Sequence, residues 1–259
     1  MSEYKKIRIK KKFGQHFLRD KNITRAAISK VEIDDKSSIF EIGCGDGYLT
    51  REILKTSAAR LWVFEIDPEW AEYVQEELGQ DQRLTIFTEN VLDADFSQLE
   101  NHAPWTLIAN LPYQVTFPIL HLLQRNIALL KEGVVMIQEE VAQKIVKQSG
   151  RGYGYPSLFF QHYFDLELLT KVPPEAFYPP PKVYSRLLYF KPKKDIVPIV
   201  DEPKFWKFIK CCFRQPRRTL ANNLKQTHYD LSKIPQDVLP LRAQQMSMQD
   251  FLELWDLLR

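Results

Sequence analysis

The sequence of 259 residues has few of the residues that build disulfide or metal scaffolds. Its three cysteines, Cys44, Cys211 and Cys212, fit neither a disulfide framework nor a zinc-ligand spacing. The five histidines form no close metal-binding pair, and no serine stands in a G-x-S-x-G nucleophile elbow. We therefore expect a reducing compartment, no metal and no serine-hydrolase chemistry.

Long apolar runs are also missing. No segment approaches the roughly 18 consecutive apolar residues that a membrane-spanning helix requires. The basic N-terminus leads into Phe13-Gly14-Gln15-His16-Phe17 instead of an apolar signal core, which argues against a secretory signal. Hydrophobic residues make up 44% and charged residues 27%, as in ordinary globular proteins. These features predict a cytoplasmic protein outside the membrane.

Positive charge is concentrated in two segments, although the net charge is only +3. The second segment extends from Lys204 to Lys225, and no Asp or Glu occurs between Lys204 and Tyr229. Clustered cations bind polyanions because neutralising phosphates releases condensed counterions. The clusters indicate a nucleic-acid partner, unless they are only a solvated tail and a solvated helix face. The first segment contains Lys5, Lys6, Arg8, Lys10, Lys11 and Lys12.

From about Ser38 onward, short apolar runs alternate with amphipathic stretches of helical spacing. This alternation is typical of βαβ units around a mostly parallel sheet. The sequence therefore predicts an α/β fold, a Rossmann-like doubly wound domain of seven strands. The expected strands are Ser38–Ile42, Leu61–Ile66, Leu84–Thr88, Trp105–Ala109, Gly133–Ile137, Leu166–Val172 and Arg186–Phe190.

A polar, proline-punctuated stretch between Phe190 and Lys204 indicates a linker. The sequence after it lacks strand-like alternation and ends in an amphipathic run, so we expect a small all-helical C-terminal domain. The expected divisions are residues 1–192 for the α/β domain, including a basic arm at 1–20, and residues 193–259 for the helical domain.

A glycine-rich octet, FEIGCGDG at residues 40–47, follows the first expected strand. Glycines at alternate positions let backbone approach a bound nucleoside closely. Dinucleotide sites prefer G-x-G-x-x-G, in which a helix N-terminus faces a pyrophosphate. The G-x-G-x-G pattern here favours a cofactor without a pyrophosphate, namely S-adenosylmethionine, over NAD. A glycine turn without a ligand is the alternative.

Two polar residues follow the next expected strands. Glu65 lies at the end of the second strand, 22 residues beyond Gly43, where a carboxylate can accept hydrogen bonds from both ribose hydroxyls. Asn90 follows the third strand and could hydrogen-bond the adenine ring of the cofactor. We expect their neighbours Ile66 and Val91 to belong to the same site.

The fourth strand ends in Asn110-Leu111-Pro112-Tyr113, at the sheet edge where open α/β folds bind ligands. The N6 amine of adenine is a poor nucleophile because its lone pair is delocalised into the ring. An Asn oxygen and a backbone carbonyl held by a rigid Leu-Pro step could accept both N–H groups and redirect the lone pair. Tyr113 could stack on an extruded base. The contribution expected is alignment and electrostatics, without a strong general base.

With these motifs the chain closely resembles the KsgA-type ribosomal RNA adenine dimethylases, relatives of the Erm resistance methyltransferases. The resemblance spans nearly the whole sequence, and its motifs stand in the right order. Besides the two motifs above, its segments are KFGQHFL at residues 12–18, QEEVA at 138–142, FYPPPKVYS at 177–185 and FRQPRRTL at 213–220.

The resemblance implies a role for each matching residue. His16 and Leu18 match an N-terminal segment that closes over the cofactor, and Phe177 matches an aromatic residue that sandwiches the flipped base against the tyrosine. The family usually has Asn where His16 stands and Asp where Asn90 stands, so altered cofactor affinity or pH dependence is expected. The family places four methyl groups on two adjacent adenines near the 3′ end of small-subunit (16S) ribosomal RNA, late in subunit assembly.

We therefore expect a monomeric methyltransferase that uses S-adenosylmethionine on the small ribosomal subunit. An Erm-type enzyme acting on large-subunit RNA and a non-catalytic RNA-binding assembly factor are the alternatives. The expected catalytic residues are Asn110, Leu111, Pro112, Tyr113 and Phe177. The expected cofactor-binding residues are His16, Leu18, Gly43, Gly45, Glu65, Ile66, Asn90, Val91 and Asn110. The expected RNA-binding residues are Lys10, Lys11, Lys12, Arg214, Arg217 and Arg218.

Overall fold

The computed structural model describes residues 7–10 and 13–259, which pack as two compact units. The first unit contains the described residues up to Ala142 together with Asp165–Pro192, and the second contains Gln143–Phe164 and Lys193–Arg259. The expected boundary after residue 192 recurs here. The segment at residues 143–164 is instead grouped with the C-terminal residues, because helix α6 (Tyr155–Tyr163) packs on helix α7 (Glu202–Cys212).

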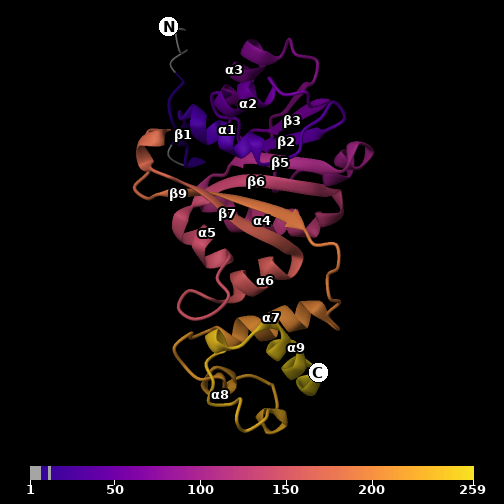
Figure 1. Ribbon diagram of the computed structural model, residues 1–259, viewed down its shortest axis with the longest axis vertical. Helices are drawn as coiled ribbons and strands as arrows, with labels where there is room; N and C mark the ends of the chain where they lie inside the picture. The colour runs from indigo at the N-terminus through magenta and orange to yellow at the C-terminus, as the bar shows by residue number, and fades with distance from the viewer. Residues whose placement is uncertain (1–6, 11–12) are drawn as a thin grey trace. The chain divides into compact units, whose positions relative to one another are not determined.

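A seven-stranded sheet in the order β4-β3-β2-β5-β6-β9-β7 forms the centre of the first unit (Figure 1). Strands β2, β3, β4, β5 and β6 pair in parallel where they are neighbours, and β9 is antiparallel to β6. All seven expected strands are present, so the predicted Rossmann-like α/β fold is confirmed. Their bounds are β2 Ser38–Ile42, β3 Arg60–Phe64, β4 Leu84–Phe87, β5 Trp105–Asn110, β6 Leu130–Gln138, β7 Phe164–Val172 and β9 Ser185–Pro192.

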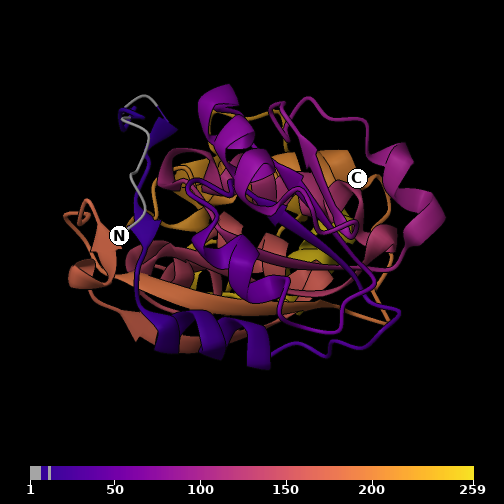
Figure 2. The ribbon, with the colours of Figure 1, turned by 90° about the horizontal axis from the view of Figure 1, so that it is seen from above.

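Helices connect the strands of the sheet, and α1 lies alongside it (Figure 2). The starts of two helices follow from their N-caps: the Asp20 carboxylate accepts from the first backbone N–H groups of α1, and Asp67 does the same for α3, whose first residue is Pro68. The α-helices are α1 Lys21–Ser29, α2 Tyr48–Ile53, α3 Pro68–Leu78, α4 Thr116–Arg125 and α5 Glu139–Ile145. Short 3-10 helices span Phe96–His102, Tyr113–Val115, Ile127–Leu129 and Pro174–Ala176.

A second, two-stranded sheet joins β1 (Phe17–Leu18) to β8 (Phe177–Tyr178) in antiparallel pairing. Phe17 pairs with Tyr178, and Leu18 pairs with Phe177. This small sheet places the N-terminal segment beside the segment at residues 177–185, although the two are far apart in the sequence.

The second unit contains α6, α7, α8 (Leu220–Leu224) and α9 (Met248–Leu258), with 3-10 turns at Leu231–Lys233 and Ala243–Gln245. Its core is aromatic: Phe205, Phe208 and Phe251 are fully buried. The expected all-helical C-terminal domain is confirmed. Among the residues that the structure describes, no helix is long and apolar enough to cross a membrane.

Candidate active site

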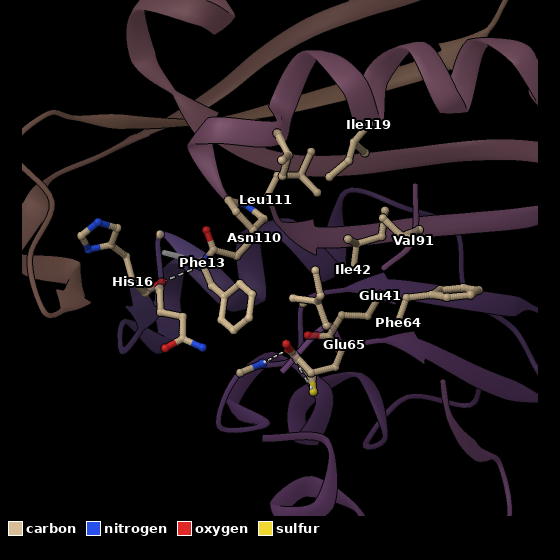
Figure 3. A pocket seen from close by; sticks show the side chains of 18 of the residues that line it. Phe13, His16, Glu41, Ile42, Phe64, Glu65, Val91, Asn110, Leu111 and Ile119 are labelled. Carbon is tan, nitrogen blue, oxygen red and sulfur yellow. Dashed lines mark hydrogen bonds between the residues drawn. The ribbon is translucent and has the colours of Figure 1, made fainter. Parts of the chain in front are cut away.

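A cavity of about 340 Å³ opens at the carboxyl ends of β2, β3 and β5 (Figure 3). Open α/β sheets bind ligands at this edge because the loops that follow parallel strands converge there. The N-terminal segment at residues 13–18 forms a further wall. The cavity brings together twelve of the predicted residues, namely His16, Leu18, Gly43, Gly45, Glu65, Ile66, Asn90, Val91, Asn110, Leu111, Pro112 and Tyr113.

The glycine loop follows β2 with left-handed backbone at Gly43 (φ 76°) and Gly45 (φ 51°). A Cβ on Gly43 would meet no atom within 4 Å, so this position faces open space in the cavity wall. A Cβ on Gly45 would lie 2.5 Å from the Phe17 ring. Gly43 therefore leaves room for a ligand, whereas Gly45 lets the N-terminal segment pack against the loop.

Glu65 follows β3 and is 4% exposed. Its Oε1 accepts from the Asp67 backbone N–H at 2.9 Å, and its Oε2 accepts from the Gly45 N–H at 3.0 Å. Burial raises the pKa of the Glu65 carboxyl, while these two backbone hydrogen bonds oppose the rise. Oε2 also accepts from the Cys44 thiol at 3.7 Å, so the acceptor site that remains for a hydroxyl, such as one of a ribose, is on Oε1.

Glu41 is a second buried carboxyl on the cavity wall, and the sequence analysis gave it no role. It is 1% exposed, lies within β2 and accepts a hydrogen bond from Thr50 Oγ1 at 2.7 Å. Desolvation raises its pKa to about 8, which keeps the group largely neutral near pH 7. The sequence did contain a signal for this residue, namely an acid between Phe40 and Ile42 in an apolar strand. Burying a carboxyl costs free energy, so buried acids are concentrated at functional sites.

Asn90 lies on the cavity wall after β4, and its amide is partly engaged. Its Oδ1 accepts from the Leu92 backbone N–H at 3.2 Å, and its Nδ2 donates to Asp93 Oδ2 at 2.8 Å. These contacts fix the side chain at the turn. The expected hydrogen bond from Asn90 to the cofactor's adenine stays a prediction.

Asp67 anchors the N-terminal segment beside the cavity and is fully buried. Lys10 Nζ lies 2.7 Å from Asp67 Oδ1, and Gln15 Nε2 donates to Asp67 Oδ2 at 3.1 Å. The Lys10 backbone N–H in turn donates to Gln15 Oε1 at 2.7 Å. Lys10, which the charge pattern assigned to RNA, is therefore paired with Asp67 and Glu69 in this structure and does not present a free cation.

The end of the same segment is tied to the glycine loop. The guanidinium of Arg19 lies 2.6 Å from the carboxylate of Asp46, a side chain that is 4% exposed. The Tyr48 hydroxyl donates to the Arg19 carbonyl at 2.9 Å. Because residues 13–18 line the cavity between these two anchors, the segment is held as a fixed wall.

Asn110 ends β5 with its amide oriented by the N-terminal segment. Its Nδ2 donates to the His16 carbonyl at 2.8 Å (Figure 3). In the part of the chain that the structure describes, Asn110 Oδ1 has no hydrogen-bond donor. The oxygen is thus the group that Asn110 offers to a ligand.

Tyr113 stacks on His16, with ring centroids 5.8 Å apart and an interplanar angle of 24°. The Tyr113 hydroxyl is 2.5 Å from Ser185 Oγ, and burial raises the pKa of the phenol. A ring nitrogen of His16, Nδ1, lies 2.7 Å from the Pro179 carbonyl. The imidazole of His16 therefore contacts the tyrosine, and its backbone carbonyl holds Asn110.

Phe177 does not line the cavity, contrary to the expectation that it sandwiches a base against Tyr113. Its side chain is 4% exposed and belongs to the core cluster that includes Phe17, Leu18 and Trp70. The physical reason is the pairing of β8 with β1, which turns Phe177 inward while Tyr178 is 62% exposed. In this structure His16 is the aromatic ring that lies over Tyr113.

The three arginines assigned to RNA lie in the exposed loop between α7 and α8. The buried side chain of Asn223 folds this loop: its Oδ1 accepts from the Gln215 backbone N–H at 3.0 Å, and its Nδ2 donates to the Gln215 carbonyl at 3.1 Å. The loop residues Arg214, Arg217 and Arg218 are all solvent-exposed. The remaining predicted RNA contacts, Lys11 and Lys12, lie outside the described residues.

The cavity fits the expected cofactor in its chemistry. Gly43 leaves space beside the wall, and the Glu65 carboxylate offers an acceptor that could bind a ribose hydroxyl. Ile66, which is 45% exposed beside Glu65, adds an apolar side chain to the cavity lining. Among residues 7–10 and 13–259, no cluster of three or more His, Cys, Asp or Glu side chains could hold a metal ion.

Comparison with known proteins gives the same assignment. The sequence profile of a family described as "Ribosomal RNA adenine dimethylase" matches residues 6–257. A protein of Chlorobium phaeobacteroides named "Ribosomal RNA small subunit methyltransferase A" is 37% identical over 260 residues, which cover 99% of this chain and 94% of that one. A protein of the same name from Francisella tularensis subsp. novicida is 35% identical over 256 residues, covering 96% and 97%.

Solved structures agree on the fold. A dimethyladenosine transferase from Plasmodium falciparum superposes with a TM-score of 0.78 at 21% identity, covering 92% of this chain and 96% of that one. The 23S rRNA methyltransferase ErmE superposes with a TM-score of 0.73 at 20% identity, covering 93% and 99%. The chain belongs to the ribosomal RNA adenine dimethylase family and is an S-adenosylmethionine-dependent methyltransferase, as its motifs predicted.

Proposed function

We propose that this enzyme dimethylates N6 of two adjacent adenosines near the 3′ end of small-subunit (16S) ribosomal RNA during subunit biogenesis. Relatives that match nearly the whole chain carry the name of a small-subunit enzyme, which favours this substrate over large-subunit RNA. We place the enzyme in the cytoplasm, where ribosomal subunits are assembled, as a monomer bound to the small subunit.

One observation carries the proposal: Asn110 uses its Nδ2 on the His16 carbonyl and keeps its Oδ1 at the cavity wall. An oxygen fixed in this way accepts one N–H of an adenine amine and rejects groups that lack a donor. Since the amide is already bonded to backbone, it cannot rotate to present its NH₂ group. The orientation is set before the base arrives, and no reorganisation is needed at the moment of reaction.

The Leu111 carbonyl is the second acceptor in this proposal. Its peptide is fixed on one side by the Leu111 N–H, which donates to the Met136 carbonyl at 3.1 Å. On the other side, the ring of Pro112 locks its own φ, here −59°, and so restricts rotation of the backbone that follows the Leu111 carbonyl. The Pro112 carbonyl, by contrast, already accepts from the Val115 N–H at 3.1 Å. When both N–H groups of the adenine amine donate to these two acceptors, its nitrogen shifts toward tetrahedral geometry. Its lone pair is then less delocalised into the ring.

Tyr113 gives the base a surface to stack on, and its hydroxyl is held by Ser185. The His16 ring stacks on the tyrosine in this structure, so a target base would displace it or stack beside it. S-adenosylmethionine, when bound, supplies an electrophilic methyl group on a sulfonium. Glu65 would bind its ribose, while Gly43 leaves space for its tail. The acceptors at Asn110 and Leu111 would hold the amine nitrogen in line with that methyl group, and this alignment lowers the barrier to transfer.

The experiment that tests this function is methylation of two substrates in parallel. Unmodified small subunits and large-subunit RNA are incubated with the protein and S-adenosylmethionine, and the modified nucleosides are identified by mass spectrometry. We expect N6,N6-dimethyladenosine at two adjacent positions of the small-subunit RNA. Modification of large-subunit RNA alone would indicate an Erm-type enzyme, and no modification of either would indicate a binding factor.

RNA binding by the helical unit is also part of the proposal. The loop that contains Arg214, Arg217 and Arg218 is exposed, carries three cations and is folded by Asn223. Phosphates are bound well by guanidinium groups held in a fixed geometry. Lys10 is not included because its charge is paired with Asp67 and Glu69.

A further inference from the structure

Two large aromatic side chains are exposed beside the target pocket. Tyr178 is 62% exposed and Tyr184 is 48% exposed, in the segment that leads from β8 into β9. Val183, between them, is 43% exposed. Folding normally buries such side chains, so a group of them on one segment marks an interaction surface.

Each tyrosine adjoins a residue that contacts the catalytic tyrosine or its partner ring. Tyr178 precedes Pro179, whose carbonyl binds the His16 ring that stacks on Tyr113. Tyr184 precedes Ser185, whose Oγ is 2.5 Å from the Tyr113 hydroxyl. Both exposed tyrosines are therefore one residue away from a contact with His16 or Tyr113, which line the pocket proposed to receive the target adenine.

Positive charge accompanies the exposed rings. Lys171 Nζ lies 4.3 Å from the centroid of the Tyr184 ring, and Lys182 is exposed between the two tyrosines in the sequence. Within the described ranges 7–10 and 13–259, neither lysine forms an ion pair with a carboxylate. A surface of aromatic faces and unpaired cations matches single-stranded nucleic acid, which presents unstacked bases and phosphates.

We propose that Tyr178 and Tyr184 stack on the nucleotides that flank the target adenine, while Lys171 and Lys182 contact their phosphates. This inference rests on the proposed function, because it needs an RNA whose adenine enters the pocket. Extruding a base breaks its stacking on both neighbours. The two tyrosines replace the lost contacts, so they lower the cost of extrusion and fix the register of the strand.

The test compares Tyr178→Ala and Tyr184→Ala with Tyr178→Phe and Tyr184→Phe, using unmodified small subunits as substrate. Stacking onto one base contributes enough affinity that each alanine variant should raise KM on the order of ten-fold, with a smaller change in kcat. The phenylalanine variants should behave like the wild type because they keep the ring. Leu257→Ala, which removes a side chain 46% exposed on α9, serves as the matched control for loss of surface apolar area.

Photochemical crosslinking of the complex then identifies what the tyrosines touch. Irradiated complexes should yield RNA-linked peptides that contain Tyr178 or Tyr184, joined to nucleotides next to the methylated adenines. A crosslink from these residues to a ribosomal protein would overturn the proposal, as would alanine variants with unchanged KM. Both results are interpretable only where the wild type dimethylates the subunit. Inactive wild type would refute the proposed function itself, while active wild type with unaffected variants would refute this inference alone.

Discussion

Asn110 has one of its two polar atoms held by the His16 backbone and the other facing the cavity, which makes its role testable on its own. Asn110→Ala removes the acceptor for the adenine amine, so we expect kcat to fall on the order of 100-fold or more. Binding of S-adenosylmethionine should remain measurable by calorimetry, because Glu65 and the glycine loop are untouched. Unimpaired dimethylation by this variant would contradict the role.

Asn110→Asp is the matched control for this prediction. It keeps an oxygen of the same reach but loses the hydrogen bond from Nδ2 to the His16 carbonyl, and a carboxylate opposite that carbonyl is unfavourable. We expect its activity to lie between those of the wild type and Asn110→Ala.

Glu41 predicts a pH dependence of stability. Its ordinary pKa of 4.5 is raised to about 8 by burial, so from about pH 5 to about pH 8 the folded protein keeps a proton that the unfolded chain has lost. Unfolding then releases a proton, and this group makes stability fall as pH rises through that window. Glu41→Gln stays neutral and keeps an acceptor for Thr50, so its stability should vary less with pH. Denaturant midpoints measured across this pH range test the difference; parallel curves for both proteins would disprove it.

At the residue scale, the sequence identified twelve of the residues that line the cavity, because strand ends of a parallel sheet meet at one edge. It located Gly43, Glu65 and Asn110 in this way. Phe177, which was expected in the pocket, lies in the core cluster of this structure, and its orientation depends on the pairing of two-residue strands, which hydrophobic periodicity does not predict. Lys10 was assigned to RNA because charge clusters do not show which carboxylate, here Asp67, lies close in space.

Among the elements, the N-terminal segment is the one most closely tied to the cofactor cavity. It contributes residues 13–18 to the wall and is anchored at Asp67 by Lys10 and Gln15. Lys10→Met should release this anchor and weaken S-adenosylmethionine binding by roughly two- to five-fold at low salt, as expected for a partly exposed ion pair. The effect should shrink as salt rises, because screening weakens the ion pair in the wild type.

Lys10→Arg is the control for the anchor, since it keeps the positive charge beside Asp67. Calorimetry at two salt concentrations provides the measurement. Equal cofactor affinity of Lys10→Met and the wild type under both conditions would show that the segment is held by its other contacts alone.

The elements themselves were predicted unevenly. All seven strands of the large sheet were placed, with shifts of a few residues at their ends, because buried strands appear as short apolar runs. The grouping of α5's end and α6 with the C-terminal residues was missed. That grouping depends on packing of aromatic rings, such as Phe159 on Trp206 at 4.9 Å, which sequence spacing does not reveal.

On the scale of the whole molecule, a catalytic α/β unit and a helical unit with an arginine loop share one chain. Reversing the charges at Arg214, Arg217 and Arg218 to Glu should weaken binding to small-subunit RNA and flatten its dependence on salt. The logarithm of the binding constant, plotted against the logarithm of salt concentration, gives the slope. Each phosphate contact that is lost should reduce that slope by about one.

The corresponding Lys204→Glu variant is a control from the same basic segment, since Lys204 already pairs with Asp201. Its salt slope should stay close to that of the wild type. A slope unchanged in the arginine variant as well would mean that the loop is only solvated.

The central claim is that the cavity wall at Asn110 and Leu111 places an adenine amine in line for methyl transfer on small-subunit RNA. Mass spectrometry of that RNA, after incubation of unmodified subunits with S-adenosylmethionine and either wild type or Asn110→Ala, tests it most directly. We predict two adjacent N6,N6-dimethyladenosines with the wild type and, in the same incubation time, modification slower on the order of 100-fold or more with the variant. Unmethylated adenosines with the wild type, or full dimethylation by the variant, would contradict the account.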